Sequence, residues 1–191
     1  KFTLDKPALI CRWRMSNKKV PMLNRHIRAL SERLVQGEPL THNMLSWAKQ
    51  HVEWSLAEGD YTARDGVLML VIDVNGNAAM TVGEYEPLAD TSAKALRARS
   101  AEARSEADET GVAPELLAAV NNGELAFVAP ADECLCGTAT LIEQLAQTKG
   151  IPVTRVDIPA QLKGALFLVS DEHGVVPATE TDAAEADAAT V

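Results

Sequence analysis

The chain has 191 residues and a mass of 20.5 kDa, enough for one large domain or two small ones with a hydrophobic core. Hydrophobic residues make up 47% and charged residues 24%, and no apolar run approaches the roughly 20 residues of a membrane-spanning helix. This composition excludes fibrous and collagen-like proteins and predicts a soluble chain without a membrane partner.

The formal charge of -9 is unevenly distributed, because residues 1–90 carry 11 basic and 11 acidic side chains whereas residues 91–191 carry 7 and 16. An acidic chain of this kind argues against nucleic acid as the main partner. Residues 1–33 are the exception, with nine basic side chains against two acidic ones. An anion-binding module built on this basic segment is therefore one open alternative.

Three cysteines, an odd number, include a Cys134-x-Cys136 spacing that is too short for an ordinary disulfide. No basic segment followed by an apolar stretch and a small-residue cleavage site opens the sequence. Both features predict a reducing, cytoplasmic compartment. The four histidines form no zinc-like cluster with these cysteines, so no metal is predicted.

The first half of the chain predicts two helices on an antiparallel sheet. Residues 8–15 suit a strand, and the apolar spacing of residues 24–34 places one hydrophobic face on a helix. A second amphipathic helix is predicted from Met44 to Gly59, with Thr41 as its N-cap.

Residues 67–74 (VLMLVIDV) are too apolar for a solvated face and too few for a buried helix, so they predict a central strand. The Asn75-Gly76 pair that follows is the preferred type I′ dipeptide and predicts a hairpin with residues 77–83. These elements together define a predicted N-terminal α/β domain over residues 1–84.

Residues 85–92 interrupt both periodicities and predict an interdomain linker. The predicted C-terminal α/β domain, residues 93–178, opens with a helix over residues 92–110. Its further elements are a hairpin of 116–120 and 125–128 turned by Asn121-Asn122-Gly123, a helix over 137–149, and strands at 153–158, 166–169 and 175–176. Residues 179–191 are nearly all Ala, Thr, Asp and Glu, and predict a disordered acidic tail.

The order of these segments resembles the fold-type IV, pyridoxal-phosphate-dependent aminotransferases and 4-amino-4-deoxychorismate lyases. The family's opening phrase GFTLGDGLFETMR is similar to Lys1-Phe2-Thr3-Leu4-Asp5 with Ala8 to Arg14, and its helix motif H-l-x-R-L is similar to His26-Ile27-Arg28-Ala29-Leu30. Its next strand and hairpin resemble Asp65-Gly66-Val67-Leu68 and the Asn75-Gly76 turn.

The second half carries the resemblance further. The family's Schiff-base lysine opens a helix reading K-x-x-R, similar to Lys94-Ala95-Leu96-Arg97, and G-x-x-E follows it, as Gly111 to Glu115 does here. The family's phosphate-holding helix start, L-p-G-i-T-R, resembles Leu135 to Thr140. The closing strands near the substrate resemble Leu166 to Ser170 and Gly174 to Pro177.

The resemblance implies a two-domain α/β (α+β) protein, with an antiparallel N-terminal sheet and a mixed C-terminal sheet, that binds pyridoxal 5'-phosphate (PLP). Lys94 would form the aldimine, and an amino acid or an amino-chorismate would be the substrate in a homodimer. The remaining implied roles are phosphate binding by Arg28, Gly137 and Thr138, pairing of Glu115 with the cofactor ring, and substrate binding near Ser170 and Gly174.

The sequence departs from this family where the chemistry lies. The family's phosphate-binding arginine aligns with Ala29, and Arg28 is one position early, about 100° round the helix. The threonine and arginine of G-i-T-R align with Ala139 and Thr140. Without a gap, the carboxylate that pairs with the pyridinium aligns with Phe127, whereas Glu115 and Glu124 fit only with a deletion, and the block E-x-x-x-x-N-L-F is missing.

Each site residue therefore has an ordinary alternative. Lys94 is also typical of a solvated helix lysine, Gly137-Thr138 of a plain helix cap, and Glu115 of a solvent-facing residue near a strand start. At the level of the whole chain, the alternative to a PLP-dependent enzyme is a catalytically degenerate homologue that acts as a binding or regulatory protein.

Overall fold

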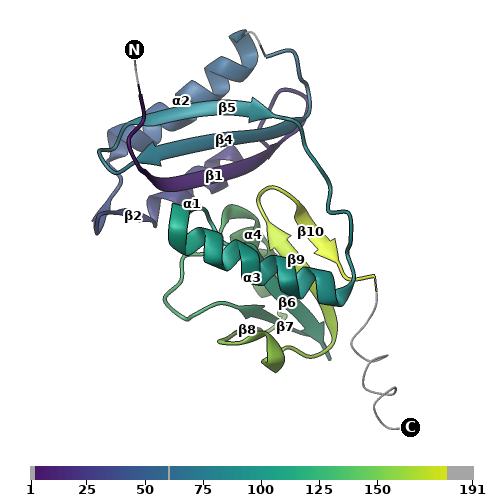
Figure 1. Cartoon of the computed structure of the whole chain (residues 1–191). Coiled ribbons are helices and arrows are strands. Elements are labelled where there is room, and N and C mark those ends of the chain that lie inside the picture. The colour runs from purple at the N-terminus through teal and green to yellow at the C-terminus, as the bar shows by residue number, and fades with distance from the viewer. Residues whose placement is uncertain (1–2, 60, 180–191) are drawn as a thin grey trace. The chain divides into compact units, whose positions relative to one another are not determined.

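The computed structural model describes residues 3–59 and 61–179 (Figure 1). The predicted acidic tail, residues 179–191, lies outside the described residues apart from Thr179. The chain separates into two compact units. Among the described residues, unit 1 comprises residues 3–59, 61–86, 106–113 and 134–137, and unit 2 comprises residues 87–105, 114–133 and 138–179.

Unit 1 is built on a three-stranded antiparallel sheet with the order β1-β4-β5. Its strands are β1 (Pro7–Met15), β4 (Gly66–Asp73) and β5 (Ala78–Gly83). The apolar segment after Gly66 occupies the centre, where Leu70 pairs with Cys11 on one side and Met80 on the other. A strand buried on both faces requires such a nearly continuous hydrophobic run, so the sequence pattern and the position agree.

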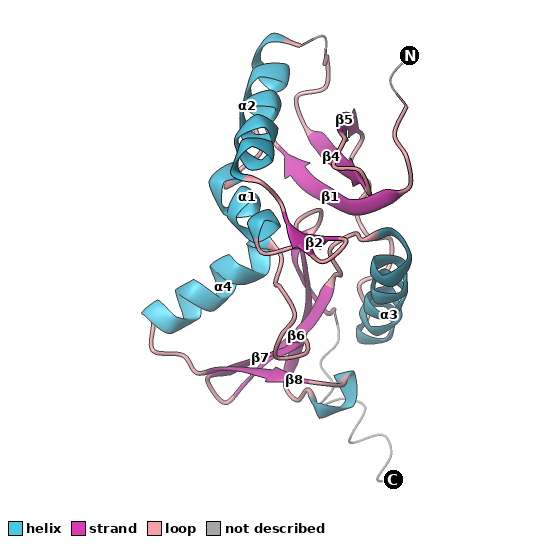
Figure 2. Cartoon of the chain, turned by 90° about the vertical axis from the view of Figure 1, so that its left-hand side faces the viewer, coloured by secondary structure: helices cyan, strands magenta, loops and turns pink. Residues whose placement is uncertain are grey.

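Two helices cover one face of this sheet: α1 (Leu23–Ser31) and α2 (His42–Glu58), as Figure 2 shows. Thr41 caps α2 as predicted, because its hydroxyl accepts a hydrogen bond from the Met44 amide at 3.1 Å. A small hairpin of β2 (Leu34–Val35) and β3 (Glu38–Pro39) joins the helices and was not anticipated. The core between helices and sheet includes Trp13, Met15, Leu30, Ala48, Val52, Leu56, Leu68 and Ile72.

The β4–β5 hairpin forms as predicted, but the type I′ turn is wrong, because Gly76 has a positive φ and Asn75 does not. The cause is Asp73, whose buried carboxylate accepts hydrogen bonds from the backbone amides of Asn75 and Asn77 at 2.9 Å each. These bonds stabilise a longer loop in which Gly76 donates to the Asp73 carbonyl. Burial alone would raise the pKa of Asp73, but the hydrogen bonds outweigh it and lower this pKa.

Unit 2 contains a mixed five-stranded sheet with the order β10-β9-β6-β7-β8. Its strands are β6 (Leu116–Asn121), β7 (Glu124–Val128), β8 (Val153–Val156), β9 (Ala165–Ser170) and β10 (Gly174–Pro177). Only β7 and β8 pair in parallel, and the other neighbours are antiparallel. The mixed C-terminal sheet expected from the resemblance is therefore confirmed.

The β6–β7 hairpin has the two-residue turn that the other hairpin lacks, since Asn122 and Gly123 both have positive φ. Helix α4 (Gly137–Thr148) makes the crossover between the parallel strands, and α3 (Ala93–Thr110) lies on the opposite face of the sheet (Figure 2). A short 3-10 helix, η1 (Pro159–Gln161), precedes β9. The core on this side includes Ala93, Leu96, Leu117, Ala119, Leu166 and Leu168.

Candidate functional site

The start of α4 is the first part of the site that the sequence predicted. Gly137, its first residue, is buried against His26 of α1, and a Cβ at this position would lie 2.5 Å from the His26 Nδ1 atom. His26 is itself buried and stacks on Trp13, with ring centroids 5.4 Å apart. Close packing against a histidine is therefore one reason for glycine here, independent of any ligand.

A carboxylate of the chain already occupies the helix start. The Thr138 backbone amide donates to Asp171 Oδ1 at 2.9 Å, and the Thr138 hydroxyl donates to the same oxygen at 2.8 Å. Asp171 follows β9 directly, so the strand delivers its side chain to the α4 N-terminus within unit 2. A negative charge at this position is stabilised by the backbone amides of the first helical turn and by the helix dipole.

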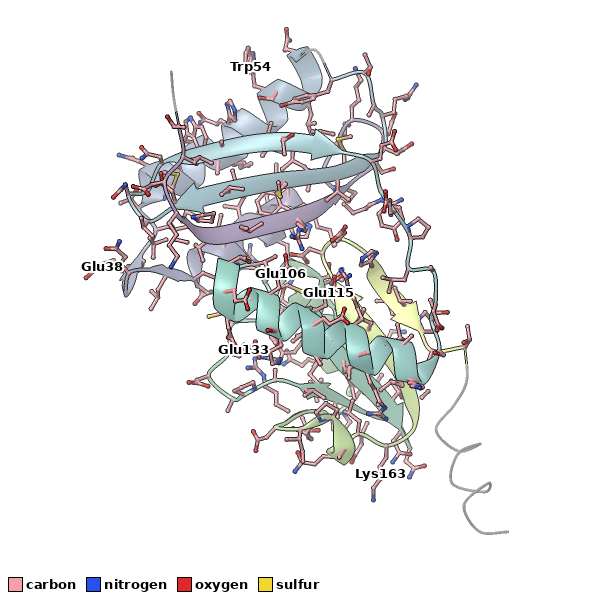
Figure 3. All side chains as sticks on the ribbon, in the orientation of Figure 1. Glu38, Trp54, Glu106, Glu115, Glu133 and Lys163 are labelled. Atoms are coloured by element: carbon pink, nitrogen blue, oxygen red, sulfur yellow. The ribbon has the colours of Figure 1, made fainter. Side chains whose placement is uncertain are left out.

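Glu115, expected to face solvent in the alternative interpretation, is instead buried, with 5% of its surface exposed. Its two carboxylate oxygens receive a bidentate pair from Arg99 of α3, Nε to Oε2 and Nη2 to Oε1, each at 2.9 Å. The Ser100 hydroxyl donates to the Glu115 carbonyl, also at 2.9 Å. Glu115 is therefore held on both its backbone and its side chain, beside α3 (Figure 3).

The turn between β9 and β10 brings a buried imidazole to the same carboxylate. His173 Nε2 lies 3.8 Å from Glu115 Oε1 and 4.0 Å from Glu172 Oε2, and only 4% of the His173 side chain is exposed. Ser170, predicted near the substrate, is buried, and its hydroxyl accepts a hydrogen bond from the His173 amide at 2.9 Å. Gly174 has a φ of +71°, which ends this tight turn.

Lys94 is the second residue of α3, and its side chain is exposed. Among the described residues, its ammonium group makes no hydrogen bond or ion pair. Arg28 is exposed in the last turn of α1. Arg28 and Gly137 belong to unit 1, whereas Lys94, Glu115 and the other predicted site residues belong to unit 2.

The sequence reasoning did not single out four side chains that the structure brings to Glu115 or to the start of α4: Arg99, Asp171, Glu172 and His173. Asp171 carried a partial signal, since an acidic side chain is stabilised at a helix start, but its partner Thr138 lies 33 residues earlier in the chain. Arg99 and Glu115 are 16 residues apart on different elements, so no periodic spacing connects them. Tertiary structure alone brings these groups together.

No family model and no curated protein matches this sequence. Similarity is found among solved structures. A protein from Legionella pneumophila subsp. pneumophila str. Philadelphia 1, described as a candidate 4-amino-4-deoxychorismate lyase, has 13% identity and a TM-score of 0.62, over 95% of this chain and 87% of that one. A fold IV-transaminase from Curtobacterium pusillum has 15% identity and a TM-score of 0.60, over 96% and 84%.

A third structure is the PLP-bound form of a hypothetical aminotransferase from Mycobacterium tuberculosis, with 12% identity and a TM-score of 0.53 over 95% of this chain and 86% of that one. Within residues 3–59 and 61–179, no helix combines the length and apolarity needed to cross a membrane.

At sequence identities of 12 to 15%, the similarity to these three solved structures concerns the architecture. The chain therefore has the fold of the fold-type IV aminotransferases and 4-amino-4-deoxychorismate lyases.

Proposed function

We propose that this chain is a catalytically degenerate fold-type IV protein, which does not take PLP in the manner of the family and acts as a binding or regulatory protein. The observation that supports this most directly is the contact between Asp171 and the start of α4. The resemblance assigns that helix start to the cofactor phosphate, and its amide and hydroxyl donors already serve a carboxylate.

The PLP phosphate does not fit beside this group. Two unit negative charges about 4 Å apart repel by about 4 kcal/mol at an effective dielectric constant near 20, and a phosphate carries more than one charge. It would also compete with Asp171 for the Thr138 amide and hydroxyl. The side chain that would compensate for such charge is absent from the helix motif, where Ala29 stands in place of the arginine.

The pyridinium nitrogen of the cofactor ring would also lack a carboxylate partner. Glu115 is the carboxylate that the resemblance offers for the pyridinium, but its negative charge is already paired with the Arg99 guanidinium. Phe127, at the position where the family has its carboxylate, is fully buried at 0% exposure and has no polar group to offer. The residues present therefore do not match a PLP site, and no catalytic step is derived through that group.

The competing proposal is a PLP-dependent aminotransferase or aminodeoxychorismate lyase in which Lys94 carries the cofactor and a small amino acid or amino-chorismate is the substrate. Its support is the fold and the Lys94 ammonium group, which is exposed and has no bonding partner among the described residues. A homodimer belongs to the same proposal. None of the three cysteines, all of which the structure describes, forms a disulfide, and this supports a reducing compartment, such as the cytoplasm, under either proposal.

Incubation with PLP, borohydride reduction and peptide mass mapping test the two proposals together. We expect no aldimine absorbance band, and label at Lys94 no greater than at Lys163, another exposed lysine of unit 2. The variants Lys94→Ala and Lys163→Ala form a matched pair for this comparison. A visible band that Lys94→Ala abolishes and Lys163→Ala preserves would refute the degenerate assignment and establish the enzyme.

A further inference from the structure

The geometry points to a divalent transition-metal site in unit 2, with Glu115, Glu172 and His173 as ligands. Each residue offers one ligand atom, and these atoms all lie within 4.8 Å of one another. Glu115 precedes β6, whereas Glu172 and His173 lie in the turn between β9 and β10, so two neighbouring strands supply the ligands. Figure 3 shows Glu115 beside the hairpin that carries the other two.

The separations suit a shared ion better than direct pairing. His173 Nε2 lies 3.8 Å from Glu115 Oε1 and 4.0 Å from Glu172 Oε2, and both distances exceed a hydrogen bond. Ligands about 2.1 Å from a tetrahedral ion would be about 3.4 Å apart, so the two His173 distances would shrink by about half an ångström and the Glu115–Glu172 distance, which is at most 4.8 Å, by up to about 1.4 Å.

The charge of the cluster also calls for a cation. Two carboxylates approach each other with 7% and 21% of their side-chain surfaces exposed, and Arg99 neutralises one of them. The cluster therefore has a net charge of -1 when the imidazole is neutral. A bound divalent ion, or a proton on His173, relieves this excess.

The ligands are held by neighbouring groups before any ion binds. Arg99 fixes the Glu115 carboxylate with two hydrogen bonds, and the Ser170 hydroxyl accepts from the His173 amide and so fixes the turn. Such outer contacts orient metal ligands and tune their affinity. Glu172 is the most exposed of the three ligands, with 21% of its side-chain surface exposed.

The donor set determines the class of ion. One imidazole nitrogen and two carboxylate oxygens suit zinc and its neighbours in the first transition row, and they give calcium or magnesium too few oxygens. Three protein ligands leave a fourth position for water. This is the arrangement of a metal site open to a small ligand.

Cobalt(II) titration of the chelator-treated full chain provides the test, because a tetrahedral Co²⁺ site absorbs in the visible range. We expect a saturable visible band that Zn²⁺ displaces, and an affinity roughly 10- to 100-fold weaker in Glu172→Gln and in His173→Gln. Glu133→Gln is the matched control, since Glu133 is another partly buried carboxylate of unit 2 paired with an arginine, Arg104. Its affinity should equal that of the unmodified chain.

Circular dichroism of each variant separates loss of the site from loss of the fold. A folded chain that gives no band at millimolar cobalt overturns the proposal, as does an equal loss in Glu133→Gln and Glu172→Gln. NMR signals of the His173 imidazole that do not change on addition of Zn²⁺ also overturn the metal site. No step of the assay involves PLP, so its result is independent of the proposed function.

Discussion

Replacement of Asp171 by alanine tests whether this side chain is the cap of α4. The change removes two hydrogen bonds, from the Thr138 amide at 2.9 Å and from its hydroxyl at 2.8 Å. Loss of an N-cap costs about 1 kcal/mol, and loss of a negative charge at a helix start adds about 0.3 to 1 kcal/mol. We therefore expect the free energy of unfolding to fall by about 1 to 2 kcal/mol.

Differential scanning calorimetry measures this effect. For a chain of 150 to 250 residues, each kcal/mol corresponds to about 2 to 4 °C, so Tm should fall by about 2 to 8 °C. Asp171→Asn keeps an acceptor but not the charge and should lose less. Asp132→Ala, at an exposed position in a loop of unit 2, is the control and should leave Tm unchanged. An equal Tm for Asp171→Ala and Asp132→Ala would refute the capping role and the argument against the cofactor built on it.

Three further predictions concern the fold. The pKa of Asp73 in the folded chain lies below its ordinary value of 3.8. The ionised carboxylate therefore stabilises the fold above that pH, and this stabilisation is lost as the pH falls through the lower folded pKa. In urea unfolding, the stability of Asp73→Asn should depend less on pH below about pH 4 than the stability of the unmodified chain does. Gly111→Ala should destabilise strongly, because φ is +73° and the new Cβ would lie 1.8 Å from the Ala8 carbonyl; a Tm within a degree of the original would contradict this. Leu96→Ala should cost about 2 to 5 kcal/mol in urea unfolding, since Leu96 is 0% exposed in the core beneath α3, and a loss under 1 kcal/mol would show that this core is not tightly packed.

Most of the fold could be predicted because the signals are local. The run VLMLVIDV is too short and too apolar for anything but a buried strand. Thr41 begins a helix and Gly111 ends one through capping, which depends only on residues nearby in the sequence. The two hairpins show the limit of this reasoning. Asn122-Gly123 adopts the expected turn, whereas Asn75-Gly76 does not, because an aspartate two residues earlier binds the loop amides.

The site was less predictable, because its contacts are made between distant segments. The burial of Glu115 could not be predicted from the residues around it in the sequence. Its charge is neutralised by Arg99, which lies on α3, a helix that packs on the sheet. In the segment Ser170-Asp171-Glu172-His173-Gly174, the sequence reasoning selected only Ser170 and Gly174, as residues near the substrate. The side chains of this segment find their partners next to β6 and at the start of α4, and no periodicity in the sequence predicts that these elements are neighbours.

The carboxylate at the start of α4 also changes how the stability of the protein depends on its surroundings. An enzyme whose helix start is completed by a bound phosphate gains free energy by mass action, and it loses that free energy when the cofactor is depleted. Here Asp171 is covalently part of the chain, so it is always present and no dissociation equilibrium governs it. At this helix start, the stability of the folded protein should therefore not depend on the concentration of PLP.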